Sequence, residues 1–427
     1  MNDVNITPSI NHKIILDIIP SQRWLNLIEL YKNQILQVLE KFEKLIDEKI
    51  FSRKLLEFAI SMNSSLWAFP YYEELLGVSK TLGISFAKTL LLQGYYEIFQ
   101  SSTTILMNKP MGKTNDLDFE EASMCNDPPI SHIHFMESQL SMLADMTINV
   151  NFYSKGKIVY RATTYPGYIG VMLGSRSNMG SVVYSNRYMK SNHYSNISRL
   201  AWGHMPTGFL IRNVMEDETI KSYSSLCGRL RQSGTMAPAY ISVTGKSNNE
   251  GTIMYRNPEL THERGFPPHN QAEMDYTEIE ANQNNENQCQ VVSKYVPVLV
   301  IVNIDTPYLQ HIEGLKDMDV SDMSSSTILN SIWNTNGTDT LWGKLSNLDY
   351  NNERYDMALY KSYDLYDAMT HEHLSTAFGS EYITNNIKKY LDFPILNNRT
   401  SFGTWIETGR NIHYTINISN SKNTDKI

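Results

Sequence analysis

Two consecutive serines, Ser101 and Ser102, stand where the residue pattern best suits chemistry. They follow a helix-like stretch that ends in YYEIF, and they begin the β-branched, strand-like segment SSTTILM. A hydroxyl is a poor nucleophile unaided, but a chain cut just before such a residue gives it a free α-amine that can act as its base. Helix-to-strand junctions with serine are common, so the junction alone also fits a purely structural role.

The other chemically capable residues fit structural roles. Cys125 lies in the turn-like MCNDPP, Cys227 in a helix-like stretch and Cys289 in an asparagine-rich stretch. Cys125 has no helix before it and no strand after it, although a displaced nucleophile there stays an alternative. His132 and His134 are expected on opposite phases or edges of a short β-like piece. No Cys or His set has zinc spacing, so no metal or cofactor is expected.

Two further motifs have ordinary interpretations. The acidic cluster Glu216, Asp217 and Glu218 falls in a helix-like stretch and is expected to form a solvated face. The segment GRLRQSG at 228–234 reads as a helix end with a glycine stop rather than a phosphate-binding loop.

The elements that must position these residues change character along the chain. The first hundred residues are mostly helical after one initial strand, whereas from Met146 short apolar segments alternate with turns. The expected helices begin at Ser21 or span 53–61, 71–82, 85–98 and 208–232. The expected strands span 13–19, 101–107, 146–153, 158–164, 167–173, 181–188, 237–245, 251–257, 296–304, 402–408 and 412–418. This order predicts an α+β fold, in which a helical N-terminal region lies beside a sandwich-like sheet core.

Composition excludes several classes of protein. The net charge is −8, from 45 acidic and 37 basic residues, and no Lys/Arg run stands out, so a nucleic-acid partner is not expected. Three cysteines in 427 residues exclude a disulfide scaffold. No apolar stretch reaches the roughly 18 residues of a membrane span, and the N-terminal MNDVNITPSINHK lacks the features of a signal peptide. The Asn-x-Ser/Thr sequons occur about as often as chance predicts for this asparagine-rich chain, so they indicate no compartment.

Several longer stretches share a pattern with a known family. KIILDIIPSQRWLNLIELY has a strand, a proline and an Arg-Trp helix start, and YYEIFQSSTTILM has a Tyr-Glu segment running into a hydroxyl-rich strand. MTINVNFYSKGKIVYRATTYPGYIGVMLG carries a Gly-Tyr-x-Gly turn at 167–170, and MAPAYISVTGKSNNEGTIMYRN carries an Ala-Pro-Ala-Tyr strand. Asn303-Ile304-Asp305 and FPILNNRTSFGTW add to the match. Over most of its length the chain resembles the family of acid ceramidases and N-acylethanolamine-hydrolysing acid amidases.

The resemblance implies an αββα sandwich of the N-terminal-nucleophile hydrolase type. Residues 1–101 would correspond to the helical α-chain and 102–427 to the sandwich-forming β-chain, lengthened by polar insertions near 257–291 and 322–390. Members of this family are lysosomal amidases that cut themselves before a catalytic cysteine and release an acyl group from sphingosine or ethanolamine. The implied ligand is therefore a lipid amide or its acyl chain.

The site that the resemblance implies is largely replaced in this chain. Ser102 holds the position of the nucleophilic cysteine. After His134 the family has Gly-Arg-Asn-x-Asp, but here the chain reads FMESQ from Phe135 to Gln139, so the arginine and the aspartate are missing. Removing one preorganised polar partner costs about 2.7–4 kcal/mol, or roughly 100- to 1000-fold in rate, although such losses need not add.

The remaining matches to the family's polar set are few. Asn186 replaces the glutamate of an Asn-Glu-Arg motif, of which only Arg187 survives. Asn303 matches the family's oxyanion donor, and Asp305 lies two residues further on. The Asp-Asp-Arg-Arg that follows in the family has no equivalent in YLQHIEGLKDMDVSD.

These replacements favour a catalytically impaired or inactive relative that keeps a structural, scaffolding or lipid-binding role. The alternative is an active lipid-amide hydrolase that uses Ser102 after self-cleavage, with Asn303 as oxyanion donor and Arg187 nearby. A third alternative uses Cys125. The polar insertions are the expected surfaces for protein partners. Because the family is lysosomal but no signal peptide is visible, a cytoplasmic or organellar location also fits the sequence.

Overall fold

The structure is a computed structural model, and it describes the chain in several stretches. The described residues are 4–47, 53–64, 70–108, 130–138, 140–177, 179–187, 193–247, 250–256, 261–265, 298–301, 384–385, 387–388, 400–408 and 411–420.

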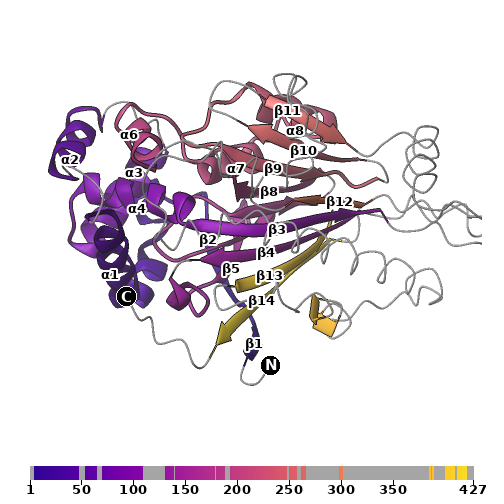
Figure 1. The fold of residues 1–427 in the computed structure, drawn as a ribbon, viewed down its shortest axis with the longest axis horizontal. Coiled ribbons are helices and arrows are strands. Elements are labelled where there is room, and N and C mark those ends of the chain that lie inside the picture. The colour runs from indigo at the N-terminus through magenta and orange to yellow at the C-terminus, as the bar shows by residue number, and fades with distance from the viewer. Residues whose placement is uncertain are drawn as a thin grey trace, which may run out of the picture.

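The N-terminal helices form a group at one end of two packed sheets (Figure 1). They are α1 (Leu25–Asp47), α2 (Arg53–Met62), α3 (Tyr71–Leu82) and α4 (Phe86–Ile98). The chain enters α1 through a 3-10 turn at Pro20–Gln22, so the helix begins four residues after the predicted Ser21.

The ends of α3 and α4 agree with the sequence prediction because both carry strong local signals. Gly83 takes up the left-handed conformation, with φ 75°, just after α3, a conformation that glycine adopts without steric cost. The hydroxyl of Ser85 accepts a hydrogen bond from the backbone N–H of Lys88 and so caps α4.

The first sheet contains the junction strand and the C-terminal hairpin, in the order β1-β14-β13-β4-β3-β12. Its strands are β1 (Val4–Pro8), β3 (Gln100–Met107), β4 (Ser131–Ser138), β12 (Val298–Ile301), β13 (Thr400–Glu407) and β14 (Ile412–Asn420). All of its neighbouring strands are antiparallel.

The second sheet is built mainly from the middle of the chain, in the order β11-β10-β9-β8-β7-β6-β5-β2. Its strands are β2 (Ile10–Ile15), β5 (Ile148–Ser154), β6 (Lys157–Thr164), β7 (Leu173–Arg176), β8 (Gly180–Asn186), β9 (Ala239–Thr244), β10 (Gly251–Arg256) and β11 (Thr261–Gly265). Strand β2 runs parallel to β5, and the other pairs are antiparallel. Strand β3 of the first sheet packs against β8 and β9 of the second.

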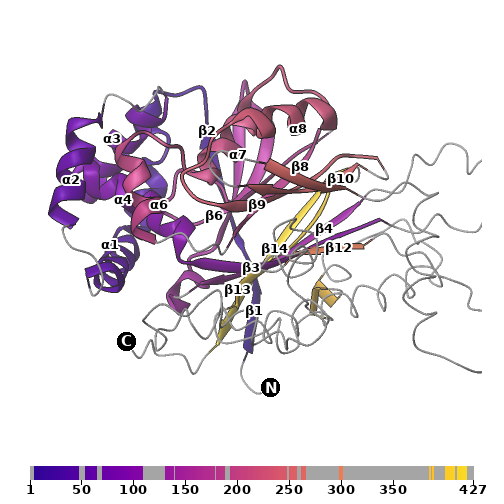
Figure 2. The same ribbon diagram turned by 45° about the horizontal axis from the view of Figure 1, so that its top comes forward.

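Three further helices follow β8: α6 (His193–Ala201), α7 (Thr207–Glu216) and α8 (Tyr223–Gln232). Helix α6 packs on α2 and α4, and α7 packs on β6, β7 and β8 (Figure 2). The single helix predicted over 208–232 is therefore wrong, because the chain breaks between α7 and α8. Asp217 bonds the backbone and hydroxyl of Thr219, and Ser222 with Ser225 forms a capping box that starts α8.

The α+β sandwich with a helical N-terminal region is confirmed. The N-terminal segment also supplies strands, since β1 pairs with β14 in one sheet and β2 with β5 in the other. Within the predicted strand 167–173 only Leu173 belongs to a strand. Of the predicted strand 296–304, β12 covers the four residues 298–301. Among the described strands, β12 lies at the edge of the first sheet.

The two predicted insertions fall mostly outside the described residues. Of 257–291 only β11 is described, and of 322–390 only residues 384–385 and 387–388. Ile387 lies against Gly403 on the face of the first sheet that points away from the second. The division of the chain at residue 101 stays a prediction.

Candidate functional site

Ser102 lies inside a strand ladder rather than at a free chain end. Helix α4 ends at Ile98, and β3 begins at Gln100, so the chain passes through the predicted junction without a break. Ser102 is 1% exposed and pairs with Met136 of β4. Because side chains alternate along a strand, Ser102 shares a face with Thr104. The hydroxyls of Thr104 and of Ser185 in β8 are 3.1 Å apart, so this face points at the second sheet.

Side chains from β8 and β4 hold the junction in place. The amide of Asn186 donates to the backbone oxygens of Ile98, at 3.3 Å, and of Gln100, at 3.4 Å. On the opposite face of β3, the hydroxyl of Ser101 donates to Glu137 Oε2 at 2.9 Å. Asn186, which replaces an expected glutamate, therefore bridges the end of α4 and the start of β3.

Met136 is the second residue of FMESQ, where the resemblance leads one to expect arginine. It lies directly opposite Ser102, is 1% exposed and belongs to the hydrophobic core. A thioether is only a weak hydrogen-bond acceptor and carries no charge. The residue paired with Ser102 therefore supplies no donor that would stabilise an oxyanion.

Arg187 follows the end of β8 and is 7% exposed. Its guanidinium carbon lies 5.7 Å from the ring centre of Tyr240 and 5.8 Å from that of Tyr255. This is the geometry of a cation–π contact with both rings. Arg187 thus directly follows β8, the strand against which the β3 strand of Ser102 packs.

The other predicted site residues lie outside the described residues. They are Asn303, Asp305, Cys125 and Cys289. Cys227 is a buried free thiol of α8, and burial raises its pKa to about 11, which agrees with the predicted core role.

A buried carboxyl that the sequence reasoning missed lies five residues before Ser102. Glu97 of α4 accepts hydrogen bonds from Tyr168 Oη, at 2.5 Å, and from the backbone N–H groups of Thr207, at 2.8 Å, and Gly208, at 2.7 Å. Burial raises its pKa to about 7, although these bonds act in the opposite direction. Both Glu97 and the Gly-Tyr-x-Gly turn lie in stretches that carry the family resemblance, but nothing local in the sequence pairs them.

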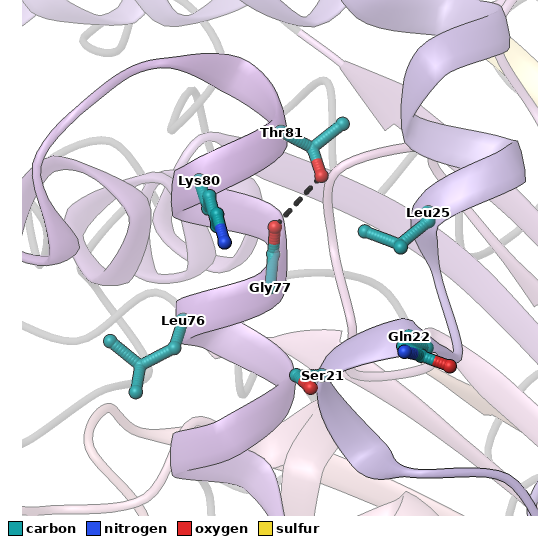
Figure 3. Close-up of a pocket in the computed structure, with 7 residues that line it drawn as sticks. All are labelled: Ser21, Gln22, Leu25, Leu76, Gly77, Lys80 and Thr81. Carbon is teal, nitrogen blue, oxygen red and sulfur yellow. Dashed lines mark hydrogen bonds between the residues drawn. The ribbon is translucent and has the colours of Figure 1, made fainter.

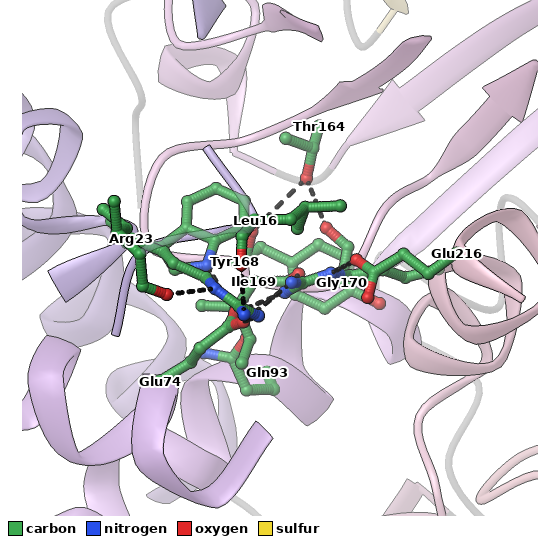
Figure 4. Close-up of polar contacts among 12 residues, drawn as sticks. Leu16, Arg23, Glu74, Gln93, Thr164, Tyr168, Ile169, Gly170 and Glu216 are labelled. Carbon is green, nitrogen blue, oxygen red and sulfur yellow. Dashed lines mark hydrogen bonds and ion pairs between the residues drawn. The ribbon is translucent and has the colours of Figure 1, made fainter. Parts of the chain in front are cut away.

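A buried ion-pair network ties the N-terminal region to the second sheet and α7 (Figure 4). Arg212 forms a bidentate pair with Glu74, and both side chains are fully buried. Arg23 and Trp24 also donate to this carboxylate, at 2.8 and 2.6 Å. Burial lowers the pKa of Arg212, but the carboxylates of Glu216 and Glu74 raise it by more. The net pKa of Arg212 is therefore well above its usual value.

Glu216 corrects the expectation of a solvated acidic face. Its Oε1 accepts from Arg212 Nε at 2.6 Å and from Tyr160 Oη at 3.0 Å, and its side chain is only 20% exposed. Asp217 instead ends α7 and bonds Thr219. The cluster is therefore partly structural.

His132 and His134 have structural roles, but the prediction that they lie on opposite faces or edges of a strand is wrong. Residues two apart on a strand share a face, and both imidazoles point at the second sheet. His132 bonds Ser181 and Ser242, each at 2.8 Å, and the Nδ1 of His134 bonds Thr104 at 2.8 Å. Among the described residues, no group of His, Cys, Asp and Glu could hold a metal ion.

Two surface hollows lie away from the predicted site. One, of about 360 Å³, lies between the start of α1 and α3 (Figure 3). It is lined by Ser21, Gln22, Leu25, Leu76, Gly77, Lys80 and Thr81. The other, of about 220 Å³, lies between β2 and α1. Neither is lined by Ser102 or Arg187.

One property of the described helices is whether their length and polarity suit a membrane span. No single one is long and apolar enough to cross a membrane. Helices α3 and α4 meet the criterion only when taken together, and they are bent by 105° at the break between them.

Known proteins similar to this chain were found by sequence and by structure. No protein-family profile matches it. It is 26% identical to the acid ceramidase of Mus musculus over 255 residues, which cover 57% of this chain and 63% of that protein. It is also 26% identical to the acid ceramidase of Homo sapiens over 255 residues, which cover 57% of this chain and 62% of that protein. The structure of a Caenorhabditis elegans N-acylethanolamine-hydrolyzing acid amidase ortholog is 19% identical, with a TM-score of 0.41, and the match covers 72% of this chain and 93% of that one. The chain thus spans less than two thirds of the length of these acid ceramidases.

Proposed function

Since the chain is a divergent member of the acid ceramidase family, we propose that it is a member that has lost amide hydrolysis. Its sandwich then serves as a structural scaffold or binds a lipid amide or its acyl chain. The division into an α-chain equivalent of residues 1–101 and a β-chain equivalent of residues 102–427 belongs to the same proposal, with the chain remaining uncut.

The observation that carries this proposal is the pairing of Ser102 with Met136. Attack by a hydroxyl on an amide builds negative charge on the carbonyl oxygen, and that charge needs preorganised donors in a water-poor site. An apolar side chain next to the nucleophile supplies none. The loss of one such donor costs about 100- to 1000-fold in rate.

The surroundings of the Ser101–Ser102 peptide bond also support the proposal. The bond lies within the β3–β4 ladder, where Ser101 pairs with Glu137 and Ser102 with Met136. Self-cleavage at Ser102 requires its hydroxyl to attack the carbonyl carbon of Ser101. A peptide bond whose two residues are both paired with β4 resists the twist that such an attack needs, because departures from planarity are costly.

A second candidate is an active lipid-amide hydrolase with Ser102 as N-terminal nucleophile. What favours it is that Ser102 holds the family's nucleophile position at the start of β3. In that case Asn303 would be the oxyanion donor, Arg187 would lie nearby and Asp305 would support the site.

Two measurements on the purified chain separate the candidates. The first is its mass under denaturing conditions, which reports a break between Ser101 and Ser102. The second is turnover of an N-acylsphingosine and an N-acylethanolamine, with Ser102→Ala as the matched control. An uncut chain without turnover agrees with the proposal, whereas turnover that disappears in Ser102→Ala would overturn it.

A further inference from the structure

The space between the two sheets contains three histidines bonded to hydroxyl groups. They are His132 and His134 of β4 and His413 of β14. His132 and His134 are fully buried, and His413 keeps part of its surface exposed. The strand registers place all three on the face of the first sheet that points at the second.

Each imidazole links the first sheet to the second through hydroxyl groups. The two ring nitrogens of His132 meet Ser181 of β8 and Ser242 of β9, each at 2.8 Å. Those of His413 meet Ser175 of β7 at 2.7 Å and Thr163 of β6 at 3.0 Å.

His134 makes its link through an intermediate. Its Nδ1 lies 2.8 Å from Thr104, whose hydroxyl lies 3.1 Å from Ser185 of β8. The other ring nitrogen, Nε2, is buried and has no hydrogen-bond partner among the described residues. In the tautomer whose Nδ1–H donates to Thr104, protonation would place an N–H at Nε2 that no described group accepts, and an unmet buried donor is costly.

Hydrogen bonding alone does not decide the charge on His132 and His413. A hydroxyl can either donate or accept, so Ser181 and Ser242 could turn to accept from a protonated His132. The decisive cost is instead an imidazolium charge removed from water without a counter-ion.

No carboxylate of the described strands faces this layer. Glu137 of β4 and Glu407 of β13 lie on the opposite face of the first sheet, where they bond Ser101 and Ser131. The groups that act on the imidazoles electrostatically are Arg161, which lowers the pKa of His413, and the neighbouring His134, which lowers that of His132.

The remaining titratable groups of the layer are also not acidic at neutral pH. They include Tyr165, which packs on the Phe402 ring beside His134, and Arg187 after β8, whose guanidinium lies over the rings of Tyr240 and Tyr255. Of the described charged groups, Arg161 acts on an imidazole, and it opposes the protonation of His413.

We propose that His132, His134 and His413 form an acid-sensitive latch between the two sheets. The latch holds the sandwich together while the imidazoles are uncharged and releases it when they take up protons. Its effect is to restrict the folded sandwich to surroundings near neutral pH or above.

The direction of the pH effect follows from burial. Burial lowers the pKa of His134 to about 3 and that of His132 well below its usual value, whereas an unfolded histidine has a pKa of about 6.5. The unfolded chain therefore binds more protons below about pH 6.5. The stability from these groups is present above that pH and is lost as the pH falls toward the folded pKa.

The test is urea unfolding of the full chain, followed by circular dichroism between about pH 7.5 and pH 5. Below about pH 6.5 each fully buried histidine should raise the unfolding equilibrium constant about tenfold per pH unit. His132 and His134 together predict a rise of about 100-fold per pH unit, and His413 adds to it, whereas the raised pKa of Glu97 offsets up to about tenfold of this rise in wild type. A wild-type constant that stays flat over this range would overturn the proposal.

Matched variants assign the effect to the latch. His134→Asn keeps a donor near Thr104 but does not titrate, so the rise should become about tenfold smaller per pH unit, whatever its effect on stability at neutral pH. The exposed His204 serves as control, and His204→Asn should leave the wild-type slope unchanged. If His134→Asn does not fold, His413→Asn takes its place and should also reduce the slope. Equal slopes in wild type and the latch variant would contradict the proposal.

Discussion

Ser102 and Met136 lie directly opposite each other in the β3–β4 ladder, and both are 1% exposed. This pairing places an apolar side chain beside the position at which the acid ceramidase family has its nucleophile. Under the proposed function, the loss of hydrolysis comes from the surroundings of Ser102 more than from its hydroxyl group. The first prediction follows from this distinction.

Replacing the hydroxyl by a thiol should not start self-cleavage. In Ser102→Cys the better nucleophile still faces Met136, and its peptide bond still lies within the ladder. We expect both Ser102→Cys and wild type to show one uncut chain by denaturing mass spectrometry. The appearance of fragments 1–101 and 102–427 in Ser102→Cys alone would mean that the surroundings remain competent.

Removing the arginine of the buried network should strongly destabilise the fold. In Arg212→Met, Glu74 keeps only the single ion pair with Arg23, although its side chain is fully buried. Breaking one partner of a buried ion pair typically costs about 3–5 kcal/mol. Urea unfolding at neutral pH measures the loss.

A surface ion pair provides the control for that variant. Lys44 and Glu40 lie 3.0 Å apart on α1, and both are largely exposed. Lys44→Met should change the free energy of unfolding by about 0.5 kcal/mol or less. If Arg212→Met and Lys44→Met cost the same, the network does not hold the N-terminal region to the sandwich.

Glu97 should make the fold less stable as the pH rises. Burial raises its folded pKa to about 7, above the ordinary value of 4.5, so the folded state holds a proton that the unfolded state has released. Stability from this group is fully present below about pH 4.5 and is lost as the pH rises toward 7, by about 3 kcal/mol in all. The difference between wild type and Glu97→Gln, measured by urea unfolding over this range, should show that loss. A pH-independent difference would show that Glu97 is ionised throughout.

Alanine substitutions at two helix glycines should change the stability of the fold in opposite directions. A Cβ at Gly77 would lie 2.0 Å from the backbone oxygen of Ser21, so Gly77→Ala must push α3 away from the 3-10 turn. A Cβ at Gly228 of α8 would meet nothing within 4 Å. Gly228→Ala should therefore stabilise the fold by up to about 1 kcal/mol, whereas Gly77→Ala should destabilise it by about 1–3 kcal/mol. Thermal unfolding of both variants tests the close approach, which equal shifts would contradict.

Local signals explain which elements could be predicted from the sequence. Helices α3 and α4 have a glycine stop and a serine cap within the chain itself, and the C-terminal hairpin has alternating apolar residues on both sides of a short turn. The break between α7 and α8 was missed because helical periodicity continues past Asp217, while the side-chain bonds of Asp217 and Ser222 end one helix and start the next.

Contacts between distant segments explain what could not be predicted. Glu97 meets Tyr168 and the start of α7 only because helices and sheets pack together. The histidines of β4 find their partners in β8 and β9 through the registers of two sheets, which no local pattern specifies. Ser102 was identified from its position, but the apolar partner across from it became visible only in the β3–β4 register.

The most direct test of the central claim is the denatured mass of the purified full chain, kept at about pH 7 and at about pH 5 and then assayed with an N-acylsphingosine. The account predicts a single species of 49.0 kDa and no turnover above that of Ser102→Ala. Two fragments that meet at Ser101 and Ser102, together with turnover that Ser102→Ala abolishes, would contradict it.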